Sequence, residues 1–211
     1  DEEVTTVAGS GNGFADGQGS AAKFSQPRGL DIDSDGVLYV ADSVNNRIRR
    51  VTQAGLVTTV AGTGSYGFGG GGAATASFRR PWDVEADAAG DLWIADRNNT
   101  RVRKLSGGVV TTAAGSGFGY DDGNALSSRF RYIEGIAISP TGVLFISDNE
   151  NQRIRRLRNT QDACSVGDTC YMSGFPDPTE SCKICQPSVS ESAFTTLSDG
   201  NDCSDDDLCT P

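Results

Sequence analysis

The sequence repeats itself three times, and this repetition limits the folds available to it. The run Val4-Thr-Thr-Val-Ala-Gly9 returns at residues 57–62 and, with one change, at 110–115, so that successive copies start 53 residues apart. Two more motifs keep this register. The first reads Pro27-Arg-Gly-Leu30, Pro81-Trp-Asp-Val84 and Ile133-Glu-Gly-Ile136 in the three repeats. The second reads Leu38-Tyr-Val-Ala-Asp42, Leu92-Trp-Ile-Ala-Asp96 and Leu144-Phe-Ile-Ser-Asp148. Self-similarity at such a period indicates stacked supersecondary units that bury their cores against one another.

Each repeat predicts four short strands separated by turn residues. In the first repeat we expect them at residues 29–33, 37–42, 47–52 and 56–61. Four short strands per repeat are typical of a propeller blade. The predicted fold is therefore all-β, with three four-stranded blades in residues 1–158 and a small, disulfide-rich, loop-dominated module in residues 159–211.

These motifs resemble the NHL repeat family. Its blades carry a Pro-x-Gly-apolar start, an apolar-aromatic-apolar-Ala-Asp strand and an Asn-x-Arg-apolar continuation, here Asn45-Asn-Arg-Ile48. The resemblance covers about residues 4–158 and implies a β-propeller. It implies less about function, because propellers of this kind include protein binders, RNA binders and a few lyases.

The negative charge is concentrated at the C-terminal end. Residues 1–158 contain 17 Lys and Arg against 18 Asp and Glu, whereas residues 159–211 contain Lys183 against ten carboxylates. The repeats lack the excess of basic residues that binding to phosphate backbones requires. We therefore expect no nucleic acid as partner, and no apolar run is long enough for membrane insertion.

All six cysteines lie in the last quarter of the chain, at Cys164, Cys170, Cys182, Cys185, Cys203 and Cys209. An even number in a short Gly, Asp and Pro-rich stretch predicts three disulfides, whose pairing the spacing leaves open, and an extracellular location. The alternative is a zinc site, since Cys182 and Cys185 have the spacing of a zinc knuckle, but the chain offers no second such pair and no histidine. The run also resembles the Cys-rich repeats of extracellular appendage proteins of the mastigoneme type.

An aspartate and an arginine recur five residues apart in every repeat. We expect ion pairs between Asp42 and Arg47, between Asp96 and Arg101, and between Asp148 and Arg153. A role in stability is favoured over a catalytic one, because a catalytic site needs only one copy.

Three further motifs have a structural and a functional interpretation. Residues 31–36 place acids at alternate positions before a glycine, like the start of a calcium loop, but we predict a hairpin turn. The Gly-rich linkers are expected to be flexible, with Tyr66, Phe68, Phe118 and Tyr120 packing on blade edges or, if exposed together, forming a contact surface. Asn98-Asn-Thr100 is a glycosylation sequon.

The strand count suggests that the ring is completed from outside these repeats. The segment formed by Val4, Thr5, Thr6, Val7 and Ala8 has the sequence of a fourth strand, whereas the third repeat has no such strand after Leu157. We expect this first segment to pair with an edge of another copy, closing a ring of two chains or forming a head-to-tail fibre. The alternative is a longer chain whose further blades close the ring.

Together these features favour a structural or assembly subunit of an extracellular filament, appendage or matrix. The alternative is a secreted propeller that binds a protein or glycan ligand. Partners are other copies, other extracellular proteins and glycans. Neither a cofactor nor enzyme activity is expected, because the chain contains no histidine, the usual metal ligand and proton shuttle of such sites.

Overall fold

The computed structural model describes residues 2–158 and four short strands further along the chain. Two compact units are present, residues 1–157 and 158–211. In the first unit the three helices are single 3-10 turns, η1 (Gly19–Ala21), η2 (Arg97–Asn99) and η3 (Asn149–Asn151). Within the described residues no helix has the length and apolar character needed to cross a membrane.

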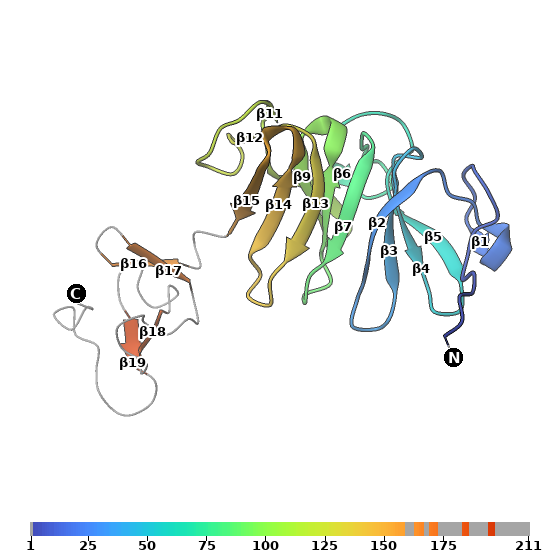
Figure 1. The fold of residues 1–211 in the computed structure, drawn as a ribbon, viewed down its shortest axis with the longest axis horizontal. Helices are drawn as coiled ribbons and strands as arrows, with labels where there is room; N and C mark the ends of the chain where they lie inside the picture. The colour runs from blue at the N-terminus through green and yellow to red at the C-terminus, as the bar shows by residue number, and fades with distance from the viewer. Residues whose placement is uncertain (1, 159–162, 167–168, 173–182, 186–193, 197–211) are drawn as a thin grey trace. The chain divides into compact units, whose positions relative to one another are not determined.

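The first sheet contains the four strands expected of the first repeat and one more. Its antiparallel order is β1-β5-β4-β3-β2 (Figure 1). The four long strands are β2 (Pro27–Ile32), β3 (Leu38–Asp42), β4 (Arg47–Val51) and β5 (Leu56–Ala61). The additional strand β1 (Gly17–Gln18) comes from the Gly-rich linker and pairs with the start of β5.

The second sheet repeats this plan, in the order β6-β10-β9-β8-β7. Its strands are β6 (Gly71–Gly72), β7 (Pro81–Ala86), β8 (Leu92–Asp96), β9 (Arg101–Ser106) and β10 (Val109–Ala114). The predicted four strands per sheet are thus corrected to five in both sheets. The fifth was missed because its residues are mostly glycine, which has low strand propensity.

The third sheet has three strands, in the order β13-β14-β15. These are β13 (Ile133–Ile138), β14 (Leu144–Asp148) and β15 (Arg153–Leu157), and a separate parallel pair joins β11 (Gly117–Phe118) to β12 (Arg129–Phe130). Residues 4–8 are not part of a strand.

Neighbouring sheets are held together by apolar cores between them. The core between the first and second sheets includes Ile48 and Ala61 on one side and Val84 and Ile94 on the other, all buried. The core between the second and third sheets includes Val102 from the second sheet. Phe78 and Phe130, from the linkers, are buried in these two cores. Each linker therefore supplies part of the core that joins two sheets.

The turn at residues 31–36 is a hairpin turn, as predicted. Asp33 Oδ1 accepts hydrogen bonds from the backbone N–H groups of Asp35 and Val37, at 3.0 and 2.9 Å. Asp87 closes the equivalent turn of the second sheet in the same way. Each aspartate side chain thus accepts hydrogen bonds from the backbone of its own turn, as Asp commonly does.

The second unit contains two described pairs of antiparallel strands. One pairs β16 (Ala163–Val166) with β17 (Thr169–Met172), and the other pairs β18 (Lys183–Cys185) with β19 (Phe194–Thr196). Cys164, Cys170 and Cys185 lie on these strands, and Cys182, Cys203 and Cys209 lie outside the described residues. The three disulfides remain a prediction.

Candidate functional site

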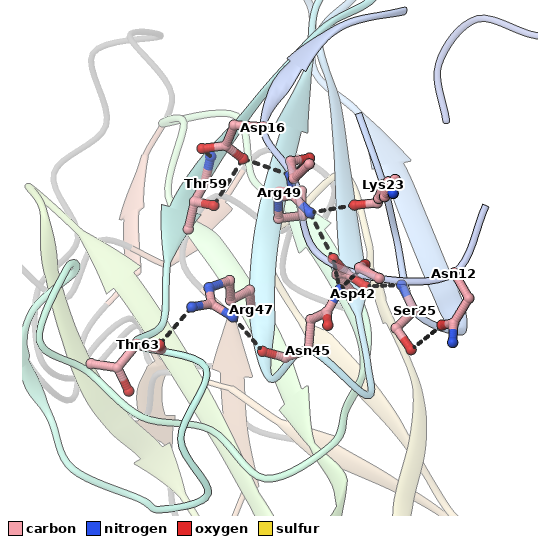
Figure 2. Close-up of polar contacts among 12 residues, drawn as sticks. Asn12, Asp16, Lys23, Ser25, Asp42, Asn45, Arg47, Arg49, Thr59 and Thr63 are labelled. Carbon is pink, nitrogen blue, oxygen red and sulfur yellow. Dashed lines mark hydrogen bonds and ion pairs between the residues drawn. The ribbon is translucent and has the colours of Figure 1, made fainter. Parts of the chain in front are cut away.

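Each sheet contains a buried ion pair, but its arginine is not the predicted one. Asp42 pairs with Arg49 at 2.7 Å, and both side chains are fully buried (Figure 2). The equivalent pairs are Asp96–Arg103 at 3.2 Å and Asp148–Arg155 at 2.8 Å. The predicted partners Arg47, Arg101 and Arg153 are therefore corrected, in every sheet, to the arginine two residues further on.

Strand register and the reach of arginine explain this correction. Asp42 lies directly opposite Arg47 in the hairpin of β3 and β4. Arg49 is the diagonal neighbour of Asp42 on the same face of the sheet. A long side chain such as that of arginine can span the distance to a diagonal neighbour. Arg47 instead donates hydrogen bonds to the carbonyl oxygens of Asn45 and Thr63, at 3.1 and 2.7 Å.

The buried aspartate also fixes the loops at one end of each sheet. Asp96 accepts hydrogen bonds from the backbone N–H of Arg79 and from Asn99 Nδ2, both at 2.8 Å. Burial raises the pKa of Asp96 and lowers that of Arg103, and the contacts between these groups oppose both shifts. A fully buried pair that ties together two loops and two strands has a structural role.

The buried arginines also order the Gly-rich linkers that were expected to be flexible. Arg49 donates to the carbonyl oxygens of Lys23 and Ala15, at 3.1 and 2.8 Å, and Arg155 does the same with Arg129 and Asp121. Each linker is thus hydrogen-bonded to the sheet that follows it.

The loops at this end of the sheets present exposed aromatic rings, each next to a guanidinium group. The rings of Phe14, Phe68 and Tyr120 are contacted by Arg47, Arg101 and Arg153, at 3.8, 4.8 and 4.0 Å from the ring centroid. These residues occupy equivalent positions in the three repeats. Their aromatic side chains are 46%, 61% and 43% exposed, so the linker aromatics form a surface and are not packed away on blade edges.

A second line of stacked side chains runs across the starts of the first strands of the three sheets. Trp82 is contacted by Arg28 of the first sheet at 4.1 Å and by Arg97 at 4.4 Å. Arg97 also lies 4.4 Å from the ring of Tyr132, which meets Phe118 edge to face. We define the loop face as Arg28, Trp82, Arg97, Phe118 and Tyr132, together with the aromatic–arginine pairs of the linkers.

Sequence reasoning missed Arg28, Trp82, Arg97 and Tyr132. The signal was present, because Arg28, Trp82 and Tyr132 lie at or next to the first residue of strand one in each repeat. Their stacking joins one sheet to the next, however, and no pattern within a single repeat reveals such a contact.

The inner edges of the sheets carry carboxylates that accept hydrogen bonds from the next sheet. Asp31 accepts one from the backbone N–H of Ala86, and Asp83 accepts one from that of Ile136, both at 2.9 Å. Glu85 lies beside them. Burial, followed by the negative charges of Asp31 and Asp83, raises the pKa of Glu85 to about 7.

We expect Glu85→Gln to stabilise the protein above pH 7 and to leave its stability unchanged below pH 4. The folded state binds the Glu85 proton more tightly than the unfolded state, so stability contributed by this group is lost as the pH rises from the unfolded pKa towards about 7. With allowance for solvent screening, the gain is about 1 kcal/mol. Urea unfolding across this pH range measures it, with exposed Glu3→Gln as the control. A constant difference at all pH values would contradict the assignment.

The structure shows where the remaining predicted site residues lie but does not test their roles. Asn98 is half-buried at the loop face and its Oδ1 accepts a hydrogen bond from Arg97, whereas Thr100 of the sequon is buried. Val4 is fully exposed and Val7 is 49% exposed. Glycosylation at Asn98 and pairing of residues 4–8 with another copy remain predictions.

Consecutive antiparallel sheets joined by cores between their faces define a β-propeller-like repeat protein. The family model of the NHL repeat matches residues 24–51, 78–105 and 130–157, so the chain carries three NHL repeats. These matches cover strands one to three of each sheet, together with the buried phenylalanine at the end of the preceding linker in the second and third repeats.

Known proteins with similar sequences are much longer than this chain. NHL repeat-containing protein 2 of Gallus gallus is 31% identical over 184 residues, covering 72% of this chain and 25% of the relative. Protein SUPPRESSOR OF QUENCHING 1, chloroplastic, of Arabidopsis thaliana is 29% identical over 191 residues, covering 82% of this chain and 18% of the relative. The chain thus spans a quarter or less of the length of these relatives.

Solved structures resemble the chain over about two thirds of its length. An auxiliary nutrient binding protein from Bacteroides thetaiotaomicron matches with a TM-score of 0.56 and 27% identity, covering 66% of this chain and 38% of the other. A second auxiliary nutrient binding protein, from Bacteroides ovatus, matches with a TM-score of 0.54 and 25% identity, covering 65% of this chain and 37% of the other.

Proposed function

We propose that the chain is a non-catalytic binding module of an extracellular protein, and that the loop face binds an acidic protein or glycan. The observation that supports this most strongly is the repeated pairing of an exposed aromatic ring with a guanidinium group on the same end of all three sheets. Aromatic and arginine side chains are the residue types enriched where proteins bind one another.

The charge of the loop face favours an acidic ligand. Four of its arginines have no carboxylate within 4.0 Å in the described part of the chain, namely Arg28, Arg47, Arg101 and Arg153. A planar guanidinium has five N–H donors and recognises carboxylates and sulfates in a bidentate way. Arg47, Arg101 and Arg153 use one or two of these donors on backbone carbonyls. The near-neutral charge of the whole repeat region favours a compact acidic ligand over a nucleic acid.

A depression at the start of β2, next in the chain to Arg28 of the loop face, offers room for part of such a ligand. It has a volume of about 580 Å³ and is lined by residues that include Asn12, Gln26 and Pro27. Asn12 occupies the position held by Tyr66 and Phe118 in the other repeats. The Asn12 side chain is smaller than these rings, and the volume of the depression is in the range of ligand pockets.

Other features support the setting and the absence of catalysis. The six cysteines favour an oxidising compartment, and the chain contains no histidine for acid–base catalysis or metal binding. Two structurally similar proteins are described as auxiliary nutrient binding proteins, which is in keeping with a binding role.

Binding to an array of acidic and neutral oligosaccharides, together with capture of acidic peptides, tests the proposal. We expect retention of acidic ligands, and we expect the combined Arg28→Gln and Phe68→Ala variant to bind at least ten-fold more weakly, because it removes an unpaired charge and an exposed ring. Phe145→Ala is the matched control, since Phe145 is 42% exposed on β14 and is not part of the loop face. Equal losses in both variants, or no retention of any acidic ligand, would count against it.

A further inference from the structure

The third sheet exposes an apolar side chain whose counterparts are fully buried. Ile154 on β15 is 74% exposed, whereas Ile48 on β4 and Val102 on β9, at the same position of their sheets, are 0% exposed. An isoleucine in this position is therefore left without the neighbours that the other two sheets provide.

What differs is both the sheet that covers this face and the strand beyond it, because Ile48 and Val102 lie in the cores between neighbouring sheets. In the first sheet β4 pairs with β5, and in the second β9 pairs with β10. Among the described residues β15 pairs with β14 alone, so its outer edge has unpaired backbone N–H and C=O groups. Such an edge is a template for the addition of a strand.

The chain contains a segment with the sequence that this edge lacks. Residues 4–8 and residues 57–61 of β5 both read Val-Thr-Thr-Val-Ala. In β5 Val57 and Ala61 are buried, at 0% and 1% exposure, whereas Val4 is 100% exposed. The same five residues are thus a core strand at one place, whereas at the other residues 4–7 are exposed and Ala8 packs against the core formed by Val40, Val51 and Val57.

A side chain at the edge of β15 is also placed to receive this strand. In the first sheet Asp16 pairs with buried Arg49 and accepts hydrogen bonds from the backbone N–H and the hydroxyl of Thr59 in β5, at 3.2 and 3.1 Å (Figure 2). Asp122 is its counterpart in the third repeat. It pairs with Arg155 at 2.7 Å, and its side chain is 69% exposed.

We propose that residues 4–8 of a second copy add to β15 as the fourth strand of the third sheet. The register of β4 with β5 assigns the pairs Leu157 with Val4, Arg156 with Thr5, Arg155 with Thr6, and Ile154 with Ala8. Thr6 then meets Asp122 as Thr59 meets Asp16.

A second copy is the partner that we propose, because each copy carries both surfaces and the two surfaces of one copy do not meet. Figure 1 places the N-terminal segment and β15 at opposite ends of the row of sheets. If each of two copies gives its segment to the other, a two-fold axis relates two identical joints and the six sheets close on themselves. This inference does not use the aromatic–arginine pairs of the loop face, but in such a pair of copies the third sheet of one copy would cover Gly9 and Phe24 of the other, which line the depression.

Sedimentation of the full chain, with two variants and their mixture, tests the joint. Wild type is expected at twice the mass of one chain. Val4→Asp and Ile154→Asp each bury a charge in the joint and are expected at the mass of one chain. Mixing them restores pairs, because the intact β15 of one variant can take the intact segment of the other.

The mixture keeps the test decisive even if one variant is less stable, since an unfolded chain would not restore pairing. Phe145→Asp introduces the same charge at an exposed apolar residue of β14, one strand in from this edge, and it is expected to remain paired. A wild-type mass of one chain, polymers longer than two chains, or a mixture that stays unpaired would overturn the proposal.

Discussion

Replacement of Asp96 by alanine is expected to lower the free energy of unfolding by about 3 to 5 kcal/mol, as is usual when one partner of a buried ion pair is removed. Arg103 is only 1% exposed and would be left as an uncompensated charge inside the second sheet. The backbone N–H of Arg79 and the amide of Asn99 would lose their acceptor as well. Urea unfolding followed by tryptophan fluorescence measures the loss, because Trp82 and Trp93 both lie in this sheet.

Arg101→Met is the control that separates the observed pair from the predicted one. Arg101 is half-buried and donates to the carbonyl oxygens of Asn99 and Ser116. Its replacement leaves no buried charge and should cost about 1 kcal/mol. A loss as large as that of Asp96→Ala would contradict the assignment of Arg103 as the partner.

Gly115→Ala is expected to destabilise the protein by about 2 to 4 kcal/mol, because it combines backbone strain with a steric clash. Gly115 follows β10 with a φ of +101°, a conformation that residues with a side chain rarely adopt. A Cβ atom there would lie 2.5 Å from the carbonyl oxygen of Thr100, which belongs to the backbone and cannot rotate away. Thermal unfolding measures the effect.

Gly90→Ala provides the matched comparison. Gly90 lies in the turn between β7 and β8 with a φ of +81°, and among the described residues no atom beyond its chain neighbours lies within 4 Å of an added Cβ. It therefore bears the strain without the backbone clash, and we expect a loss of about 1 kcal/mol. Similar losses for the two variants would show that the clash contributes little.

The strands were predictable because the same pattern occurs in each of the three repeats. Leu56–Ala61 was predicted with the bounds that β5 has, and the other strands of the first repeat begin or end within two residues of the expected positions. Alternation of side chains along a strand depends on local geometry alone, so a sequence reveals it.

Contacts that depend on the twist of a sheet or on the neighbouring repeat were not predictable in this way. The choice of Arg49 over Arg47 follows from a diagonal contact between two strands. The stacking of Arg28 on Trp82 joins two repeats that the sequence separates by 54 residues. The order of the Gly-rich linkers depends on hydrogen bonds from buried arginines that lie further along the chain.

The placement of each buried Asp–Arg pair within one sheet has a consequence for how such a chain can change length. Asp, Arg, the linker that they hold and the phenylalanine that the linker buries all belong to a single repeat. Insertion or loss of one whole repeat in the DNA would leave every internal contact of the others intact. A change of a few residues would instead separate an arginine from the linker it organises, so lengths that differ by complete repeats should be tolerated far better than small insertions within one.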